Sequence, residues 1–275
     1  MEAKKRASLT EGSAWSFDPM ETAKQRAAAY NRTPGSMTGK DCPKCRNKGQ
    51  IMIVKENGST AVRECECMGF RHSLRRLERS GLQELVKRCR FDTFQTAEQW
   101  QQQAKEQAWQ YAAAPAGRWF VAAGQPGSGK THLCVAVCRE LMLRGAEVRY
   151  MLWRDTVTRL KAVVNDAQEY ARLMEPLKRV SVLYIDDLFK TGKGQAPTGA
   201  DANVAFELLN ARYMNENSIT VISTERTLSE LLEIDEAVGS RIAQRCKGAY
   251  LCLTGAEKNW RTKDRRKNDG WPDNI

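Results

Sequence analysis

Residues 124–131 read Gly-Gln-Pro-Gly-Ser-Gly-Lys-Thr and match the phosphate-binding pattern G-x-x-x-x-G-K-[ST] in full. An apolar run precedes this loop and a helical pattern follows it, which is the context that the pattern requires. Glycines let backbone N–H groups converge on a phosphate at a helix N-terminus. We expect Lys130 to neutralise phosphate oxygens and Thr131 to hold Mg²⁺. The predicted nucleotide-binding residues are Gly124, Gln125, Pro126, Gly127, Ser128, Gly129, Lys130 and Thr131.

A second acidic motif follows about 50 residues later, where residues 182–187 read Val-Leu-Tyr-Ile-Asp-Asp. An apolar strand that ends in two carboxylates suits a metal-linked nucleotide site. We expect Asp186 to bind Mg²⁺ and Asp187 to polarise the attacking water. A strand that runs into an acidic helix cap is the alternative, and the spacing from Lys130 argues against it.

Four cysteines form a second candidate site: Cys42 and Cys45 are followed, after 19 residues, by Cys65 and Cys67. The intervening residues predict a hairpin, with strands at 51–55 and 60–63 on either side of an Asn-Gly turn. Two cysteine pairs joined by a hairpin are typical of a zinc ribbon with tetrahedral thiolate coordination. His72 could replace one thiol, and chance clustering of reduced thiols is the alternative. We expect a structural Zn²⁺, because so small a hairpin would hardly fold without metal.

The elements that must position these residues alternate along the chain. Strands are predicted at 119–123, 148–152, 180–185, 219–223 and 250–253, and helices at 131–144, 156–165, 169–178 and 203–215. This alternation predicts an α/β fold with a five-stranded parallel sheet between helices. Basic helices broken at Gly81 are expected within 73–90, and a further helix at 97–113.

The 275 residues carry a net charge of +11, which is unevenly distributed. Residues 91–257 are nearly neutral, with 19 basic and 20 acidic groups, so the surplus lies in the flanking segments. A basic flank suits a polyanion such as nucleic acid, although a solvated surface is the alternative. We find no apolar run that could span a bilayer and no signal peptide in residues 1–10, so we expect a cytoplasmic protein with no membrane partner.

With the phosphate-binding loop and the paired aspartates, the chain resembles the AAA+ ATPases. That resemblance implies a polar sensor at the tip of the neighbouring strand, where Ser223-Thr224-Glu225 lies, and favours Thr224 or Glu225. It also implies an arginine finger within 235–245, for which Arg241 and Arg245 are the candidates; a surface salt bridge is the alternative for each. Most AAA+ proteins have Glu in place of Asp187, which favours slow turnover and an ATP-dependent switch.

The chain ends about twenty residues after the last predicted strand, which leaves no room for the helical lid of full AAA+ machines. Such lid-less cores are typical of the DnaC/DnaI-type helicase loaders and the IstB-type transposition ATPases, which the chain resembles over residues 42–261. Arg261 could serve as a nucleotide sensor. We expect a flexible basic segment at 1–40, a zinc ribbon at 41–72, a helical linker at 73–115, the AAA+ core at 116–257 and a basic tail at 258–275.

The resemblance implies an ATPase that loads or regulates a replicative DNA helicase on single-stranded DNA and assembles with itself when ATP is bound. Arg154, Arg159 and Lys161 are candidate DNA contacts, and so is the basic loop 190–197, which could instead contact another subunit or be an ordinary flexible loop. Two alternatives remain: an IstB-type transposition-accessory ATPase, and an adaptor that binds ATP without hydrolysing it. The expected cofactors are ATP, Mg²⁺ and Zn²⁺.

Overall fold

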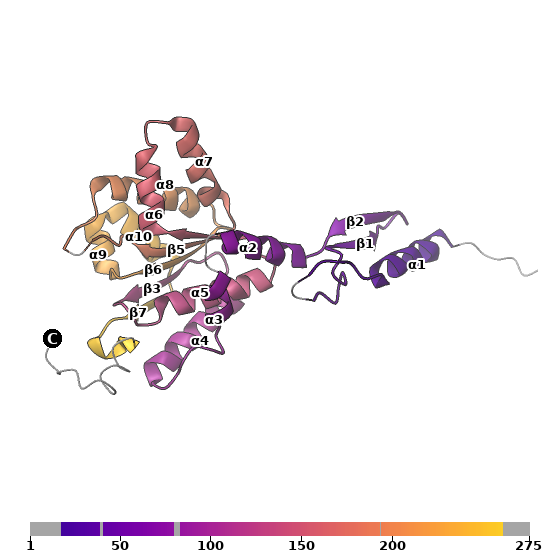
Figure 1. Ribbon diagram of the computed structural model, residues 1–275, viewed down its shortest axis with the longest axis horizontal. Helices are drawn as coiled ribbons and strands as arrows, with labels where there is room; N and C mark the ends of the chain where they lie inside the picture. Colours follow the sequence, from indigo (N-terminus) through magenta and orange to yellow (C-terminus); the bar gives the residue numbers. More distant parts are fainter. Residues whose placement is uncertain (1–17, 39–40, 80–82, 193, 261–275) are drawn as a thin grey trace, which may run out of the picture. The chain divides into compact units, whose positions relative to one another are not determined.

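The computed structural model describes residues 18–38, 41–79, 83–192 and 194–260 (Figure 1). It divides into two compact units with the boundary between Met68 and Gly69, and each unit is described by itself. The expected sensor Arg261 and the greater part of the expected basic tail lie outside the described residues.

The smaller unit is a β-hairpin with one helix packed against it. Its strands, β1 (Gln50–Val54) and β2 (Thr60–Glu64), pair antiparallel as the sequence predicted. The helix α1 (Pro19–Arg32) packs on β1, and the Asn31 side chain exchanges two hydrogen bonds of 2.9 Å with the backbone of Met52. This part of the first 40 residues, which we expected to be a flexible segment, is therefore a helix held by tertiary contacts.

The larger unit is built on a five-stranded parallel sheet with the strand order β4-β5-β6-β3-β7. The sheet confirms the predicted α/β fold. Its strands are β3 (Phe120–Gly124), β4 (Val148–Leu152), β5 (Val182–Leu188), β6 (Ile219–Thr224) and β7 (Tyr250–Leu253).

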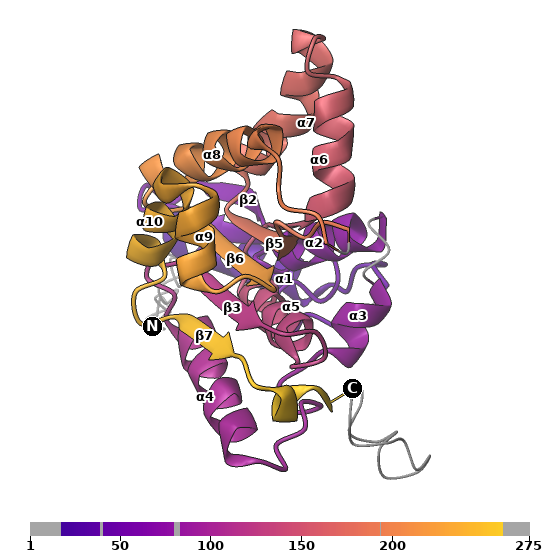
Figure 2. The same ribbon diagram turned by 90° about the vertical axis from the view of Figure 1, so that its left-hand side faces the viewer.

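Helices cover both faces of this sheet, with α3, α4 and α5 on one side and α6 to α10 on the other (Figures 1 and 2). Neighbouring residues of one strand therefore point into different cores: Phe120 packs with α4 and α5, whereas Val121 packs with α8 and α10. The helices are α2 (Cys67–Arg79), α3 (Gln83–Arg88), α4 (Gln99–Ala113), α5 (Lys130–Leu143), α6 (Trp153–Ala162), α7 (Ala167–Arg179), α8 (Gly199–Met214), α9 (Leu228–Ile234) and α10 (Glu236–Arg245).

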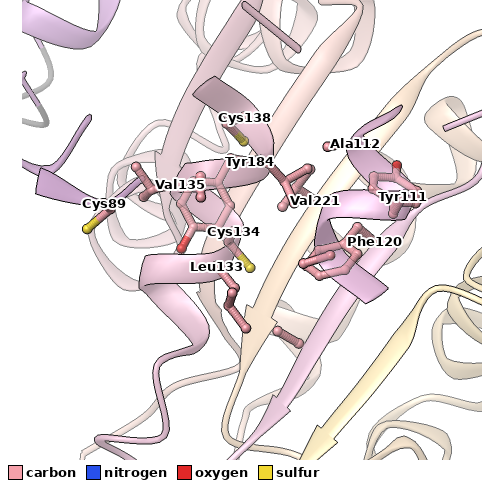
Figure 3. Close-up of a cluster of buried hydrophobic side chains, with 14 of the residues drawn as sticks. Cys89, Tyr111, Ala112, Phe120, Leu133, Cys134, Val135, Cys138, Tyr184 and Val221 are labelled. Atoms are coloured by element: carbon pink, nitrogen blue, oxygen red, sulfur yellow. The ribbon is translucent and has the colours of Figure 1, made fainter. Parts of the chain in front are cut away.

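The core around α5 fixes the helix that follows the phosphate-binding loop. Figure 3 shows Leu133, Cys134 and Cys138 of α5 among Tyr184 of β5 and Val221 of β6. Within residues 73–115, which we expected to form a helical linker, α3 and α4 both pack on α5 and contribute to the same core. Strand β3 and helix α5 are thus held rigidly on either side of the loop that joins them.

Candidate nucleotide-binding site

A cavity of about 630 Å³ opens at the carboxyl ends of β3, β5 and β6. This is the edge at which parallel α/β sheets bind ligands, since the loops and helix N-termini meet there. The cavity brings together the phosphate-binding loop and both aspartates that the sequence analysis singled out, together with Glu225. Its polar lining includes Ser128, Lys130, Thr131, Asp186, Asp187, Lys190 and Glu225.

Two glycines of the loop have conformations and contacts that no other residue could reproduce without strain. Gly124 has φ 138°, and a Cβ at this position would lie 2.3 Å from the carbonyl oxygen of Leu253. Gly129 caps α5 with φ 88°, and a Cβ there would lie 2.8 Å from the Phe94 ring. The loop is therefore shaped to present backbone N–H groups at the start of α5, where the helix dipole favours an anion.

Lys130 and Thr131 line the cavity. Lys130 is 5% exposed, and its Nζ donates a hydrogen bond of 2.8 Å to the carbonyl oxygen of Gln125. Burial lowers the pKa of the Lys130 ammonium, and the carboxylates of Glu225 and Asp187 act in the opposite direction. The two carboxylates thus favour the charged form of Lys130, which is the form that binds a polyphosphate.

Asp186 is surrounded by hydroxyl donors. Its Oδ1 accepts hydrogen bonds from Thr131 (3.3 Å), Tyr184 (2.6 Å) and Ser223, and its Oδ2 accepts one of 3.0 Å from Tyr150. Burial and the charge of Asp186 raise the pKa of both tyrosines, so both remain protonated donors. The carboxylate is 7% exposed and lies next to the Thr131 hydroxyl, which is the pairing that a Mg²⁺ ion bound to a nucleotide needs.

Asp187 adopts the left-handed conformation, with φ 57°, at the point where the register between β5 and β6 shifts. Its backbone N–H donates to the hydroxyl of Ser223 over 2.9 Å, while its side chain turns to the cavity and accepts a 2.9 Å hydrogen bond from Lys190. Aspartate tolerates this conformation better than most residues. The irregular end of β5 thus directs the two neighbouring aspartates to different positions, Asp186 to a buried one and Asp187 to the rim.

The three sensor candidates at the end of β6 separate into different roles. Thr224 is fully buried and its hydroxyl donates to the Leu188 carbonyl over 2.9 Å, so it does not line the cavity. Glu225 lines the cavity and accepts a 2.8 Å hydrogen bond from Lys190. Ser223 contacts both aspartates. Of the two residues favoured by the resemblance, Glu225 is the one that faces the cavity.

The finger candidates Arg241 and Arg245 lie on α10 and do not line this cavity. Arg245 donates to the carbonyl oxygens of Glu216 and Ser218 over 3.2 Å, near the amino ends of the strands and away from the phosphate-binding loop. Arg241 donates to the Asn210 side chain over 3.0 Å at the junction of α8 and α10. Arg241 also donates to the carbonyl oxygen of Ala237 over 2.8 Å, so both arginines contact their own chain and these contacts do not choose between the two candidates.

Aromatic side chains form a further wall of the cavity that the motifs did not reveal. Phe94, Trp100 and Trp260 line it, and the Trp260 backbone N–H donates to the Gly127 carbonyl over 3.0 Å. Flat rings beside a phosphate-binding loop suit a nucleobase. Like Tyr150 and Tyr184, these residues come from separate elements that only the fold brings together. The sequence held a signal for Tyr184 alone, because the period-2 pattern of β5 places it on the same face as Asp186.

The four predicted cysteine ligands gather in the smaller unit, where all four sulfur atoms lie within 4.8 Å of one another. The Sγ atoms are 3.8 Å apart for Cys42 and Cys65 and 3.5 Å apart for Cys45 and Cys67. A zinc–sulfur distance of about 2.3 Å gives a tetrahedron with edges of about 3.8 Å, so the thiols fit Zn²⁺.

The acidity of one of the two buried thiols, that of Cys45, also fits a metal site. Burial of Cys45 disfavours its thiolate, but hydrogen bonds from the Gly49 backbone and the other thiols outweigh this effect and lower its pKa to about 7. Burial raises the pKa of Cys65. His72, the alternative ligand, belongs to the larger unit and is not a member of the group.

The five-stranded parallel sheet carries a glycine-rich loop before α5, a buried aspartate at the end of β5 and a polar residue at the end of β6. Together these features define a P-loop nucleotide-binding protein with the AAA+ architecture. The chain belongs to the family of IstB-like ATP-binding proteins, whose model matches residues 93–266.

No helix in the described part of the chain has the length and apolar character that crossing a membrane requires.

Named proteins and a solved structure are also similar to this chain. The chain is 33% identical over 227 residues to the phage-like element PBSX protein XkdC of Bacillus subtilis (strain 168), covering 78% of this chain and 83% of the relative. It is 26% identical over 176 residues to the replicative helicase loader DnaC of Escherichia coli (strain K12), covering 63% and 69%. A crystal structure of the DnaC helicase loader shares the fold, with a TM-score of 0.50 and 19% identity over 60% of this chain and 96% of the other.

Proposed function

We propose that this protein is an ATP-hydrolysing DNA replication protein that loads or regulates a replicative helicase on single-stranded DNA. The observation that carries the proposal is the cavity itself, which collects Lys130, Thr131, Asp186, Asp187 and Glu225 at one edge of the sheet. Kinship with proteins named as a phage-like element protein and as a replicative helicase loader supports the cellular role.

Each residue has a defined task in this proposal. The backbone of residues 124–129 and the Lys130 ammonium bind the phosphates of ATP, while Thr131 and Asp186 hold Mg²⁺. Asp187 orients and polarises the attacking water, and Glu225 senses the terminal phosphate. When bound, Mg²⁺ neutralises charge on the phosphate oxygens. The short side chain of Asp187 reaches less far into the cavity than a glutamate would, which suits slow, regulated turnover.

Surfaces outside the cavity bind the partners in this proposal. Arg154 and Arg159 are exposed on α6 and suit a nucleic-acid backbone, whereas Lys161 is already paired with Asp201 at 2.8 Å. Arg241 or Arg245 serves as the finger that reaches the ATP of a neighbouring subunit during self-assembly. The cysteine cluster holds a structural Zn²⁺ in the module that contacts the helicase.

The first test is ATP turnover with and without single-stranded DNA, with Lys130→Ala as the control. We expect weak basal turnover that single-stranded DNA stimulates and that the control abolishes. Co-purification with a replicative helicase would then support the loader role, whereas co-purification with a transposase would favour the IstB-type alternative. ATP binding without turnover under any condition would contradict hydrolysis and leave a non-hydrolysing adaptor.

A further inference from the structure

Lys190 lies at the rim of the cavity between the two carboxylates that face it. Its Nζ is 2.9 Å from Oδ2 of Asp187 and 2.8 Å from Oε1 of Glu225. It lines the same cavity as Lys130, so two ammonium groups face the space that receives the phosphates. Apart from the expectation that the loop 190–197 contacts DNA or a subunit, nothing in the sequence assigns Lys190 a role at the nucleotide.

A strained turn fixes the backbone from which the Lys190 side chain extends. The Lys190 backbone N–H donates to the Asp187 carbonyl over 2.9 Å, and both Asp187 and Phe189 have left-handed φ values, 57° and 58°. A phenylalanine in this conformation is an outlier that persists only where its surroundings dictate it. Phe189 is fully buried, with its ring 5.2 Å from that of Trp153. The core therefore holds the turn that points Lys190 back at Asp187.

The ion pairs of Lys190 are easily exchanged for other partners. The side chains of Lys190, Asp187 and Glu225 are 42%, 24% and 31% exposed, and partly exposed ion pairs contribute little net stability. A terminal phosphate offers several charged acceptor oxygens, which form stronger hydrogen bonds. It would also repel Asp187 and Glu225 unless a cation lay between them. Lys190 contacts both carboxylates and can supply that cation.

We propose that Lys190 binds the terminal phosphate of a nucleoside triphosphate and so makes the site distinguish a triphosphate from a diphosphate. The proposal rests on the nucleotide site proposed above and adds a residue outside its motifs. In the diphosphate-bound or empty site, Lys190 holds Asp187 and Glu225 together. In the triphosphate-bound site, Lys190 turns to the phosphate and leaves Asp187 free to orient water.

The test is the affinity of the Lys190→Met variant for MgADP and for the Mg²⁺ complex of a non-hydrolysable ATP analogue, measured by calorimetry. We expect analogue binding to weaken about tenfold or more, the scale of one charge-assisted hydrogen bond, while ADP binding changes by less than about twofold. The Lys190→Arg variant, which keeps the charge, should retain most of the preference.

Lys178→Met is the matched control. Lys178 also bridges two carboxylates, those of Glu207 at 2.6 Å and Glu175 at 3.3 Å, but it lies on α7 and does not line the cavity. Both nucleotides should bind this variant as they bind the wild type. If Lys190→Met weakens both nucleotides equally, or neither, the assignment of Lys190 is overturned and the nucleotide site stands. If the wild-type protein binds neither nucleotide, the nucleotide site itself is wrong.

Discussion

The two aspartates at the end of β5 are neighbours in sequence but differ in their surroundings. Asp186 is buried and accepts hydrogen bonds from four hydroxyl groups, whereas Asp187 lies at the rim with its carboxylate paired to Lys190. A buried carboxylate that hydroxyl donors hold in place, with a single donor on Oδ2, is suited to hold a metal at a fixed position. A rim carboxylate with one exchangeable partner is suited to act on water. The structure thus supports a division of tasks that the sequence motif alone only suggested.

Replacement of Asp187 by Asn tests the water-activating task. Asn tolerates the left-handed backbone as Asp does, and the backbone hydrogen bond to Ser223 does not involve the side chain, so the fold should be kept. Loss of the base should lower ATP turnover by about 10²-fold or more, with nucleotide affinity nearly unchanged. Steady-state kinetics and calorimetry measure the two quantities. Unchanged turnover would remove Asp187 from this role.

Replacement of Tyr184 by Phe tests the hydroxyl cage around Asp186. The variant loses a 2.6 Å hydrogen bond to a buried carboxylate, which should lower the free energy of unfolding by about 1.5–3 kcal/mol. It should also raise the Mg²⁺ concentration that half-saturates metal-dependent nucleotide binding, because the carboxylate is less well held. Chemical denaturation and a Mg²⁺ titration report these effects.

Tyr111→Phe is the control for this variant. Tyr111 is equally buried, but its hydroxyl donates to the neutral carbonyl of Arg118, over 2.6 Å, outside the cavity. The Tyr111→Phe change should lower the free energy of unfolding by only about 0.5–1.5 kcal/mol and leave the Mg²⁺ titration unchanged. Equal Mg²⁺ shifts in the two variants would mean that Tyr184 acts through general stability and not through Asp186.

At the scale of elements, the loop between β3 and α5 depends on glycines that cannot be replaced. Gly129→Ala would impose a side chain at φ 88° and place its Cβ 2.8 Å from the Phe94 ring. We expect a loss of about 1–3 kcal/mol in stability and a severe loss of nucleotide binding. Gly199→Ala, in the first turn of α8 with open space around its Cβ, is the control and should be neutral or slightly stabilising. Normal nucleotide binding by Gly129→Ala would contradict the role given to this loop.

The strands and most helices of the larger unit were predictable because their apolar patterns follow the periods of the buried faces. The predicted strand at 148–152 matches β4, and the helix expected at 131–144 is α5, shifted by one residue. The end of β5 was less predictable: the strand continues to Leu188 through the left-handed Asp187, which depends on contacts with β6. Local pattern cannot reveal a register shift that tertiary pairing creates.

The same reason explains which parts of the site were missed. Lys130, Thr131 and Asp186 belong to motifs whose chemistry requires fixed spacing, so sequence alone predicts them. Tyr150 reaches Asp186 because β4 pairs with β5 in one register, with Tyr150 opposite Tyr184. The aromatic wall joins residues from α4, from the segment between α3 and α4, and from the chain after β7. These contributions exist only after the sheet and its covering helices have formed.

At the scale of the whole molecule, the chain combines two units with different sources of stability. The larger unit has extensive cores on both faces of its sheet. Among the described residues, the buried cluster of the hairpin consists of Cys45, Ile51 and Cys65, with Cys42, Ile53 and Cys67 partly buried against it, so four of these six side chains are thiols. So small an apolar core cannot offset the conformational entropy of the chain, whereas structural Zn²⁺ contributes about 10–16 kcal/mol in small domains. Metal should therefore control the folding of the hairpin but not that of the sheet.

Cys45→Ser tests this separation. We expect the wild-type protein to contain stoichiometric zinc and the variant to lose it, together with the protection of the hairpin amides from hydrogen exchange, because a tetrahedral site with three thiolates binds more weakly. Cys252→Ser, which changes an exposed cysteine outside the cluster, should keep both. Nucleotide affinity should be unchanged in both variants, since the cavity lies within the larger unit. Zinc retained by Cys45→Ser would refute the ligand assignment, and loss of nucleotide binding on zinc removal would show that the sheet depends on the metal after all.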